Sequence, residues 1–222
     1  MKFEILTLFP KSTESYFDES ILSRAQKNKL IEIETHNIRD YSLDKHHSVD
    51  DKPYGGGPGM VMMIEPIYQA LKKIRHYRPS TPLRDRVKTR TILFSAKGKK
   101  FDQAMAQEFS KLDRLIMICG RYEGVDERVA QNLVDAEISI GDYVLTGGEL
   151  PAMIVVDAVS RLIPGVLGAE ESLAEESFSQ KDYLEYPQYT RPEKFKTWKV
   201  PEILLSGDHK KIKDWRQKSA SK

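Results

Sequence analysis

Residues 91–140 decide the fold, and they read TILFSAKGKKFDQAMAQEFSKLDRLIMICGRYEGVDERVAQNLVDAEISI. Three short apolar runs in this stretch predict strands, and the amphipathic runs between them predict helices. Strands that alternate with helices favour a parallel sheet with helices packed on it. The sequence therefore predicts an α/β fold. The expected order is strand 91–95, helix 101–110, strand 114–119, helix 126–134 and strand 137–140.

The chain before this stretch extends the same alternation. We expect strands at Lys2–Leu8 and Leu30–Thr35, and helices at Asp18–Lys29 and Glu65–Arg75. The run Tyr-Gly-Gly-Gly-Pro-Gly at Tyr54–Gly59 cannot form regular structure and is predicted to be a loop. The basic segment Arg78–Arg90 contains two prolines and is predicted to be an exposed loop.

The chain after this stretch changes character at Pro164. Leu150–Ile163 is apolar on nearly every side, which predicts a helix buried in a core or in a subunit interface. Asp208 is a candidate N-cap for a short helix at His209–Lys218. The expected organisation is an α/β domain over 1–165, an irregular acidic linker over 166–190 and a short, mostly helical region over 191–222.

Composition places the chain among ordinary globular proteins. Of 222 residues, 40% are hydrophobic and 31% charged, and no apolar run approaches the ~18 residues of a membrane span. The first residues carry no pattern of a secretory signal. Cys119 is the one cysteine, so no disulfide framework is expected, and it is predicted to be a buried apolar residue of a cytoplasmic protein. Adjacent histidines at 46 and 47 point in different directions, and no metal site is predicted.

The net charge of +2 hides an uneven distribution. Residues 72–100 hold eleven Lys and Arg against one Asp, and residues 191–222 hold ten against four acids. Residues 170–185 hold six acids against one Lys. Two basic segments with an acidic stretch between them favour a phosphate-rich partner such as RNA, and a solvated surface is the alternative.

Three of the predicted strands run into glycine-containing loops, at 96–98, 120–124 and 141–149. Ligands on open α/β sheets bind beyond the carboxyl ends of the strands, and glycine lets the backbone approach a ligand closely. The dinucleotide and phosphate-loop motifs are both absent from the sequence. The loops therefore indicate either a ligand site of another kind or ordinary turns.

Five strings make a more specific case. They are DDKPYGGGPGM at 50–60, CGRYEGVDER at 119–128, SIGDYVLTGGELPA at 139–152, IPGVLG at 163–168 and YTRP at 189–192. In order and spacing they resemble the bacterial tRNA (guanine-N1)-methyltransferase family, from the first strand to about Trp215.

The resemblance implies a fold and an activity that spacing alone does not. The fold would be a parallel α/β sheet with a deep trefoil knot of the SPOUT type, an exception to the rule that chains do not thread their own loops. The enzyme would be a homodimer that transfers a methyl group from S-adenosylmethionine to N1 of the guanosine immediately 3′ of the tRNA anticodon. The expected partners are tRNA and a second copy, with neither DNA nor a membrane; a requirement for Mg²⁺ stays open. The alternative hypotheses are a knotted methyltransferase that acts on another RNA position and an RNA-binding module without catalysis.

By resemblance, the cofactor contacts lie on the three loops. One string departs from the family: Phe94-Ser95-Ala96-Lys97-Gly98 stands where Leu-Ser-Pro-x-Gly is expected. The expected cofactor-binding residues are Ser95, Gly120, Tyr122, Glu123, Ile140, Gly141, Asp142, Tyr143, Val144, Leu145, Gly147, Gly148 and Pro151.

The resemblance also assigns catalytic and substrate residues. Arg161 would stabilise the charge that develops on guanine O6, and its alternative role is an ion pair with Asp157 one helical turn earlier. Glu176, where the family has Asp, would remove the N1 proton as general base. Asp50 and Glu185 would contact the substrate, and Glu185 is the second candidate for the base. The alternative for both glutamates is a plain acidic linker.

Overall fold

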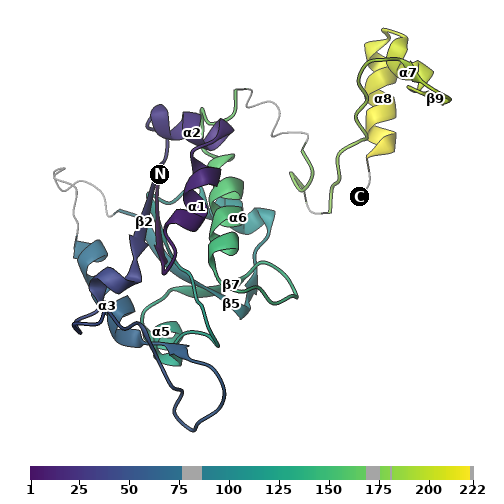
Figure 1. Cartoon of the computed structure of the whole chain (residues 1–222). Coiled ribbons are helices and arrows are strands. Elements are labelled where there is room, and N and C mark those ends of the chain that lie inside the picture. The colour runs from purple at the N-terminus through teal and green to yellow at the C-terminus, as the bar shows by residue number, and fades with distance from the viewer. Residues whose placement is uncertain (77–86, 169–175, 181, 221–222) are drawn as a thin grey trace. The chain divides into compact units, whose positions relative to one another are not determined.

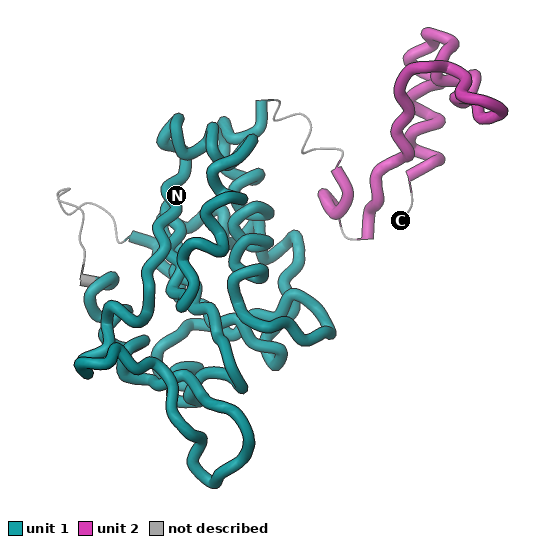
Figure 2. Tube along the Cα trace, in the orientation of Figure 1, with its two compact units in different colours: residues 1–168 teal, residues 169–222 magenta. Residues whose placement is uncertain are grey.

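The computed structural model describes residues 1–76, 87–168, 176–180 and 182–220. They form two compact units, Met1–Gly168 and Ala169–Lys222 (Figure 2). Unit 1 is a sheet covered by helices, and unit 2 contains short helices and a hairpin (Figure 1).

A five-stranded sheet forms the centre of unit 1, in the order β2-β1-β6-β5-β7. Every pair of neighbouring strands is parallel, which confirms the predicted parallel α/β fold. The central strand, β6, is apolar at four of its five positions because helices cover both faces of the sheet. The bounds are β1 Lys2–Thr7, β2 Glu32–Asn37, β5 Thr89–Lys100, β6 Arg114–Ile118 and β7 Ala136–Ser139.

Side chains of alternate strand residues enter two hydrophobic cores, one on each face of the sheet. Leu115 and Met117 of β6 enter the first core, and Ile116 and Ile118 enter the second. Four helices cover the first face: α1 Lys11–Phe17, α2 Ser20–Lys27, α4 Gln103–Phe109 and α6 Glu149–Ser160. The second face is covered by η1 Ile38–Tyr41, α3 Ile64–His76 and α5 Glu127–Asn132.

Side-chain caps set where several helices begin. Asp102 accepts a hydrogen bond from the Met105 amide at the start of α4, and Asp126 accepts one from Arg128 at the start of α5. Each cap satisfies a backbone amide that the helix itself leaves without a partner. In unit 2, Asp208 caps α8, His209–Ser219, through the amides of Lys210 and Lys211, as the sequence predicted.

The prediction that the strand beginning at Thr91 ends at Ser95 is wrong. β5 continues to Lys100, and its register against β7 shifts between Phe94 and Lys99, so the expected loop is a bulge within the strand. Gly98 permits this arrangement, since a Cβ there would lie 2.4 Å from the backbone nitrogen of Ile138. Thr89 and Arg90, expected in the basic loop, begin β5, and residues 77–86 of that loop lie outside the described residues.

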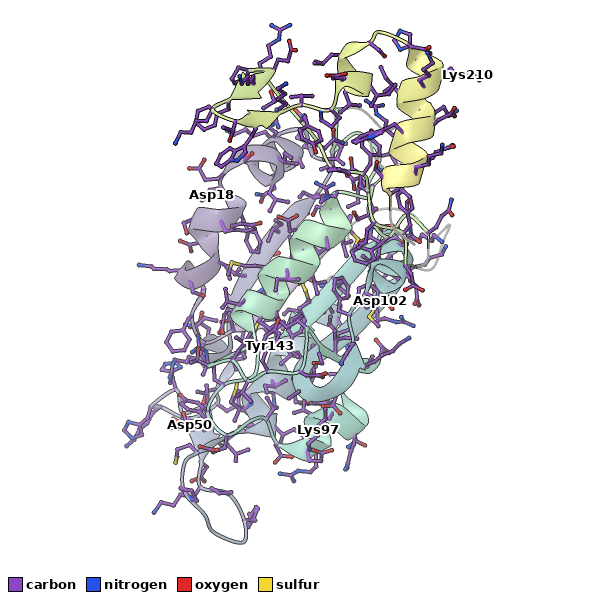
Figure 3. All side chains as sticks on the ribbon, turned by 90° about the vertical axis from the view of Figure 1, so that its right-hand side faces the viewer. Asp18, Asp50, Lys97, Asp102, Tyr143 and Lys210 are labelled. Carbon is purple, nitrogen blue, oxygen red and sulfur yellow. The ribbon has the colours of Figure 1, made fainter. Side chains whose placement is uncertain are left out.

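A long glycine loop leaves unit 1 between two very short strands, β3 Asp50–Asp51 and β4 Val61–Met62. Gly55, Gly56, Gly57 and Gly59 all have positive φ, so the backbone takes conformations that other residues rarely adopt. The loop projects from the carboxyl end of the sheet, and Asp50 lies at its base (Figures 1 and 3). The sequence predicted this loop but not the two strands.

Unit 2 contains α7 Glu202–Leu205, α8 and the hairpin of β8 Lys194–Phe195 and β9 Trp198–Lys199. The sequence predicted α8 and missed α7 and the hairpin. No residue in the described part of this unit is a buried hydrophobic one.

Candidate functional site

A pocket of about 340 Å³ opens at the carboxyl ends of β5, β6 and β7. This is the edge at which open α/β sheets bind ligands. Three segments make its walls: the β5 bulge at 94–97, the loop at 120–125 and the loop at 140–148. The volume falls in the range of small-molecule sites.

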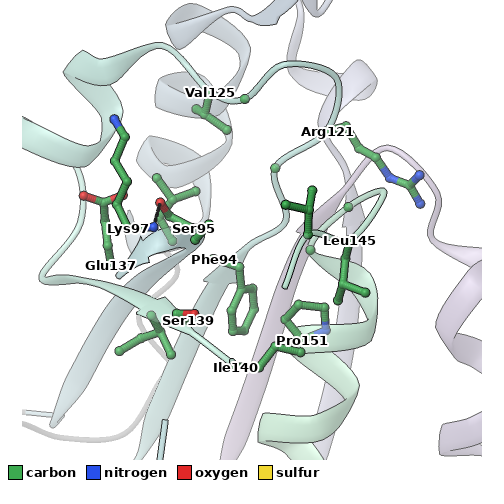
Figure 4. A pocket seen from close by; sticks show the side chains of 18 of the residues that line it. Phe94, Ser95, Lys97, Arg121, Val125, Glu137, Ser139, Ile140, Leu145 and Pro151 are labelled. Carbon is green, nitrogen blue, oxygen red and sulfur yellow. Dashed lines mark hydrogen bonds between the residues drawn. The ribbon is translucent and has the colours of Figure 1, made fainter. Parts of the chain in front are cut away.

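The pocket has an apolar side and a polar side (Figure 4). Phe94, Leu145 and Pro151 gather on one side, where a flat aromatic base could pack. Ser95 and Lys97 lie on the other side beside Glu137, and they offer hydroxyl, ammonium and carboxylate groups. The site can therefore hold a ligand with one apolar ring system and one polar or charged end.

The loop at 140–148 lies so close to the end of β6 that only glycine fits at position 148. The Gly148 amide donates to the Gly120 carbonyl oxygen at 3.0 Å. A Cβ at Gly148 would lie 2.6 Å from the Cα of Cys119. At this point the pocket wall is backbone packed on backbone.

A buried carboxylate ties this wall to the rest of the unit. Glu149 is 3% exposed; its Oε1 accepts a hydrogen bond from Thr7 Oγ1 at 2.6 Å and its Oε2 accepts one from Arg121 Nε at 3.0 Å. Arg121 also donates to the Thr146 carbonyl oxygen at 3.2 Å and stacks on the Phe9 ring, 4.6 Å from its centroid. One carboxylate thus connects the end of β1 with both glycine loops.

The glycine loop at 54–59 and the residues that follow it contact the pocket loop at 120–125. The Glu123 amide donates to the Met60 carbonyl oxygen at 3.0 Å, and the Met62 amide donates to the Gly124 carbonyl oxygen at 2.9 Å. Gly59 lies against the Glu123 side chain. A molecule bound to the glycine loop at 54–59 would therefore lie next to the pocket.

The expected cofactor residues lie around this pocket. All of them line it except Asp142, whose carboxylate pairs with Lys100. Other lining residues were not among the expected contacts, although several belong to the glycine-containing loops singled out in the sequence. The lining residues outside the expected set are Leu93, Phe94, Ala96, Lys97, Arg121, Gly124, Val125, Glu127, Ala130, Glu137, Ile138, Ser139 and Thr146.

The other expected site residues lie elsewhere. Arg161 caps the far end of α6, about 15 Å along the helix from Pro151 at a rise of 1.5 Å per residue, and it does not line the pocket. Asp157, its alternative partner, accepts a hydrogen bond from the Tyr16 hydroxyl, and its carbonyl oxygen accepts one from the Arg161 amide at 3.2 Å. Glu176 and Glu185 belong to unit 2. The structure therefore brings the expected cofactor residues together in unit 1, and within that unit it separates Arg161 from them.

Cys119 directly follows β6, lies against Gly148 of the pocket wall and is fully buried. Burial raises the pKa of its thiol well above the ordinary value, and the nearby Glu149 carboxylate raises it further. A thiol held protonated is a poor nucleophile. The predicted role of Cys119 as a buried apolar residue is confirmed.

A second cluster of charges lies away from the pocket, on β1 and β2. Glu4, Glu34 and His36 bring three possible metal ligands together. The Lys2 ammonium lies among the carboxylates, 2.6 Å from Glu34 and 3.4 Å from Glu4. An ammonium in that position neutralises the cluster, which therefore makes a poor metal site. Burial would raise the pKa of Glu4, but the His36 ring 3.5 Å away and the hydrogen bond from Arg114 lower it to about 2.

No helix in the described parts of the chain combines the length and the apolar character needed to cross a membrane. A parallel sheet with a ligand pocket built from glycine loops at its carboxyl edge defines the class of open-sheet α/β proteins that bind a small molecule there. The family model for tRNA (Guanine-1)-methyltransferase TrmD matches residues 1–222. The chain belongs to this family.

Relatives named tRNA (guanine-N(1)-)-methyltransferase are similar over nearly the whole chain. The one from Ruminiclostridium cellulolyticum is 53% identical over 220 residues, which are 99% of this chain and 91% of that protein. The one from Carboxydothermus hydrogenoformans is 54% identical over 223 residues, 99% of this chain and 83% of that protein. The one from Clostridioides difficile is 52% identical over 221 residues, 99% and 92% of the two chains.

Proposed function

We propose that this chain transfers a methyl group from S-adenosylmethionine to N1 of the guanosine immediately 3′ of the anticodon in tRNA. The observation that carries the proposal is the backbone-walled pocket at the carboxyl edge of the sheet, in a chain that belongs to the tRNA (guanine-1)-methyltransferase family. The pocket fits the cofactor because it combines an apolar side for the adenine ring with polar groups for the charged end.

The cofactor supplies an activated methyl group on a sulfonium. The chain has to hold guanine N1 in line with that group and remove the N1 proton, because the protonated nitrogen is a poor nucleophile. Gly120, Leu145 and Pro151, which line the pocket, would hold the cofactor that supplies this methyl group. Glu176 takes the proton, and Arg161 stabilises the negative charge that develops on guanine O6. Glu185 is the second candidate for the base, and Asp50 contacts the substrate.

A second copy of the chain is needed to complete this site. Arg161 lies one helix length from the pocket of its own chain, so it serves the pocket of the partner. The outer face of α6 supports this assembly: Leu150 is 53% and Ile154 44% exposed, while Val155 and Val156 on the inner face are buried. An exposed apolar helix face of this kind favours a homodimer interface.

The fold proposed for this unit contains a deep trefoil knot. The contact of Gly148 with Cys119 and Gly120 supports it, since the loop at 140–148 closes tightly on the end of β6 before the chain enters α6.

A methyl-transfer assay on undermethylated tRNA tests the proposed function. We expect label on N1 of the guanosine beside the anticodon. Label at another position would favour a knotted methyltransferase with a different target, and binding of tRNA without transfer would favour an RNA-binding module. A Mg²⁺ requirement would appear as lost turnover with unchanged cofactor affinity when EDTA is added.

The general base is tested by Glu176→Gln, which keeps the shape of the side chain and removes its basicity. Loss of a general base typically lowers the rate by ~10²–10⁴-fold. We expect single-turnover rates to fall by that amount while tRNA and cofactor still bind, and Glu176→Asp to stay active. If Glu185→Gln loses the rate and Glu176→Gln keeps it, the two glutamates exchange roles.

A further inference from the structure

The β8–β9 hairpin of unit 2 presents two aromatic rings to solvent. Phe195 and Trp198 are partners in the ladder, and their ring centroids lie 5.9 Å apart at an interplanar angle of 41°. Trp198 is 68% and Phe195 54% exposed. Exposed aromatic pairs of this size are uncommon because burying them would stabilise the protein.

These two rings are separate from the aromatic contacts that hold the rest of unit 2 together. Tyr189 packs on Trp215 with centroids 6.4 Å apart, and the Arg216 guanidinium lies 4.8 Å from the Tyr186 centroid. The hairpin is closed by its own backbone, through the hydrogen bond from the Val200 amide to the Glu193 carbonyl oxygen at 2.9 Å. The Phe195–Trp198 pair is therefore available to a ligand.

Three lysines lie in the same hairpin, one of them beside the rings. Lys194 and Lys199 face each other at the next position of the ladder, and alternation places them on the opposite side from the rings. Lys196, in the turn, holds its ammonium 5.6 Å from the Phe195 centroid. The six residues 194–199 contain these three lysines and no acid. Flat apolar rings beside positive charges match nucleotides, whose bases are flat and whose phosphates are negative.

We propose that the β8–β9 hairpin binds unpaired nucleotides of an RNA, with bases stacked on Phe195 and Trp198 and a phosphate held by Lys196, while Lys194 and Lys199 on the other face of the hairpin add to the local positive charge. The ligand is single-stranded, since stacking on these rings requires a base whose face is free. The inference rests on the proposed function in one respect: the loops of the tRNA substrate supply the unpaired nucleotides.

Tryptophan fluorescence tests the stacking directly. The chain has two tryptophans, so Trp215→Phe leaves Trp198 as the only one and keeps a ring against Tyr189. We expect a single-stranded oligouridylate to quench Trp198 in the full-length variant. A blunt RNA duplex with the same number of phosphates should quench it far less at equal concentration.

Further substitutions separate the rings from the charges. Phe195→Ala, added to Trp215→Phe, removes one ring and should weaken oligouridylate binding by roughly 10-fold, because base–aromatic stacking contributes about 1–3 kcal/mol per base. Leu205→Ala, an exposed apolar residue of α7, is the matched control and should leave the affinity unchanged. With tRNA, Trp198→Ala should raise KM more than it lowers kcat.

Three outcomes would overturn the inference. Equal quenching by duplex and single strand would reduce the hairpin to a phosphate-binding surface. Absence of quenching by either RNA would show that the hairpin does not bind RNA. A Trp198 signal that changes with protein concentration and not with RNA would assign the rings to a contact between copies. A chain that binds oligouridylate in this way but transfers no methyl group would keep the inference and lose the proposed function.

Discussion

At the scale of single residues, Glu149 connects the segments that form the pocket wall, although its side chain does not line the pocket. It is buried, and it holds Arg121 and Thr7 from two other segments. A buried carboxylate is stable only when its partners are in place. The geometry of both glycine loops therefore depends on one charge.

Glu149→Gln should weaken cofactor binding. The substitution keeps the size of the side chain and leaves Arg121 without its ionic partner, and breaking a partly buried pair costs about 3 kcal/mol. We expect the cofactor Kd to rise by at least ~10-fold, measured by calorimetry, with a lower Tm. Glu108→Gln breaks the exposed pair with Arg90 and is the control, expected to change neither quantity. An unchanged Kd in Glu149→Gln would show that the loops hold their shape without this tie.

Glu4 predicts how stability depends on pH. Its folded pKa of about 2 lies below the ordinary value of 4.5, so its ionised form stabilises the folded state. That contribution is complete above about pH 4.5 and is lost as the pH falls toward 2. Glu4→Gln should lower the free energy of unfolding at pH 7 by roughly 3 kcal/mol and flatten its dependence between pH 5 and pH 3, as urea titrations would measure. A variant as pH-sensitive as the parent would place the acid-labile group elsewhere.

At the scale of elements, the sequence predicted what depends on local pattern. The run at 114–118 is apolar at four of five positions, and it forms the central strand. α1 was missed because its sequence KSTESYF is polar, with Thr13 and Phe17 alone buried in it. The β5 bulge was missed because it depends on β7 lying against Gly98, a contact between segments 40 residues apart.

The sequence also predicted which loops line the pocket. The strings shared with the family include most of the pocket residues, because these residues lie on loops that directly follow β6 and β7 in the sequence. Asp142 was included with its neighbours, yet its side chain turns toward Lys100. Arg121 and Glu149 stand 28 residues apart, and no periodicity connects them. A pair of this kind is visible only when the chain is folded.

Gly148 tests whether the loop wall has to be backbone. In Gly148→Ala, the new Cβ would meet the Cα of Cys119 at 2.6 Å, so one of the two segments has to shift. Overpacking typically destabilises by about 1–3 kcal/mol. We expect a lower Tm and at least ~10-fold weaker cofactor binding by calorimetry. Gly168→Ala has nothing within 4 Å of the added methyl and should behave as the parent. Parent-like binding by Gly148→Ala would mean that the close approach is not required.

At the scale of the whole molecule, the length of α6 separates Arg161 from the pocket of its own chain. A site completed by the partner predicts complementation between two inactive variants. Arg161→Ala keeps a working pocket, and Gly148→Val keeps a working arginine. When the two are co-expressed, the mixed dimer holds one complete site, so activity should return to about a quarter of the parent under random pairing of chains.

The outcome separates the two arrangements. If Arg161 served its own pocket, each chain of the mixed dimer would carry one defect, and the mixture would stay inactive. Each variant alone is the control and should be inactive. Light scattering on both variants checks that neither substitution abolishes assembly.

Cys119 gives the protein a built-in reporter. It is the only thiol in the chain, and it lies fully buried beneath Gly148. A thiol-specific dye can therefore react only after the pocket floor opens, and its labelling rate measures how often that happens under native conditions. Cofactor bound at 100 times its Kd should slow the labelling by about 100-fold, because a ligand that binds only the closed form stabilises it in proportion to its occupancy. The rate of dye labelling at Cys119 thus reports the opening of the pocket without a mutation, a radiolabel or an RNA.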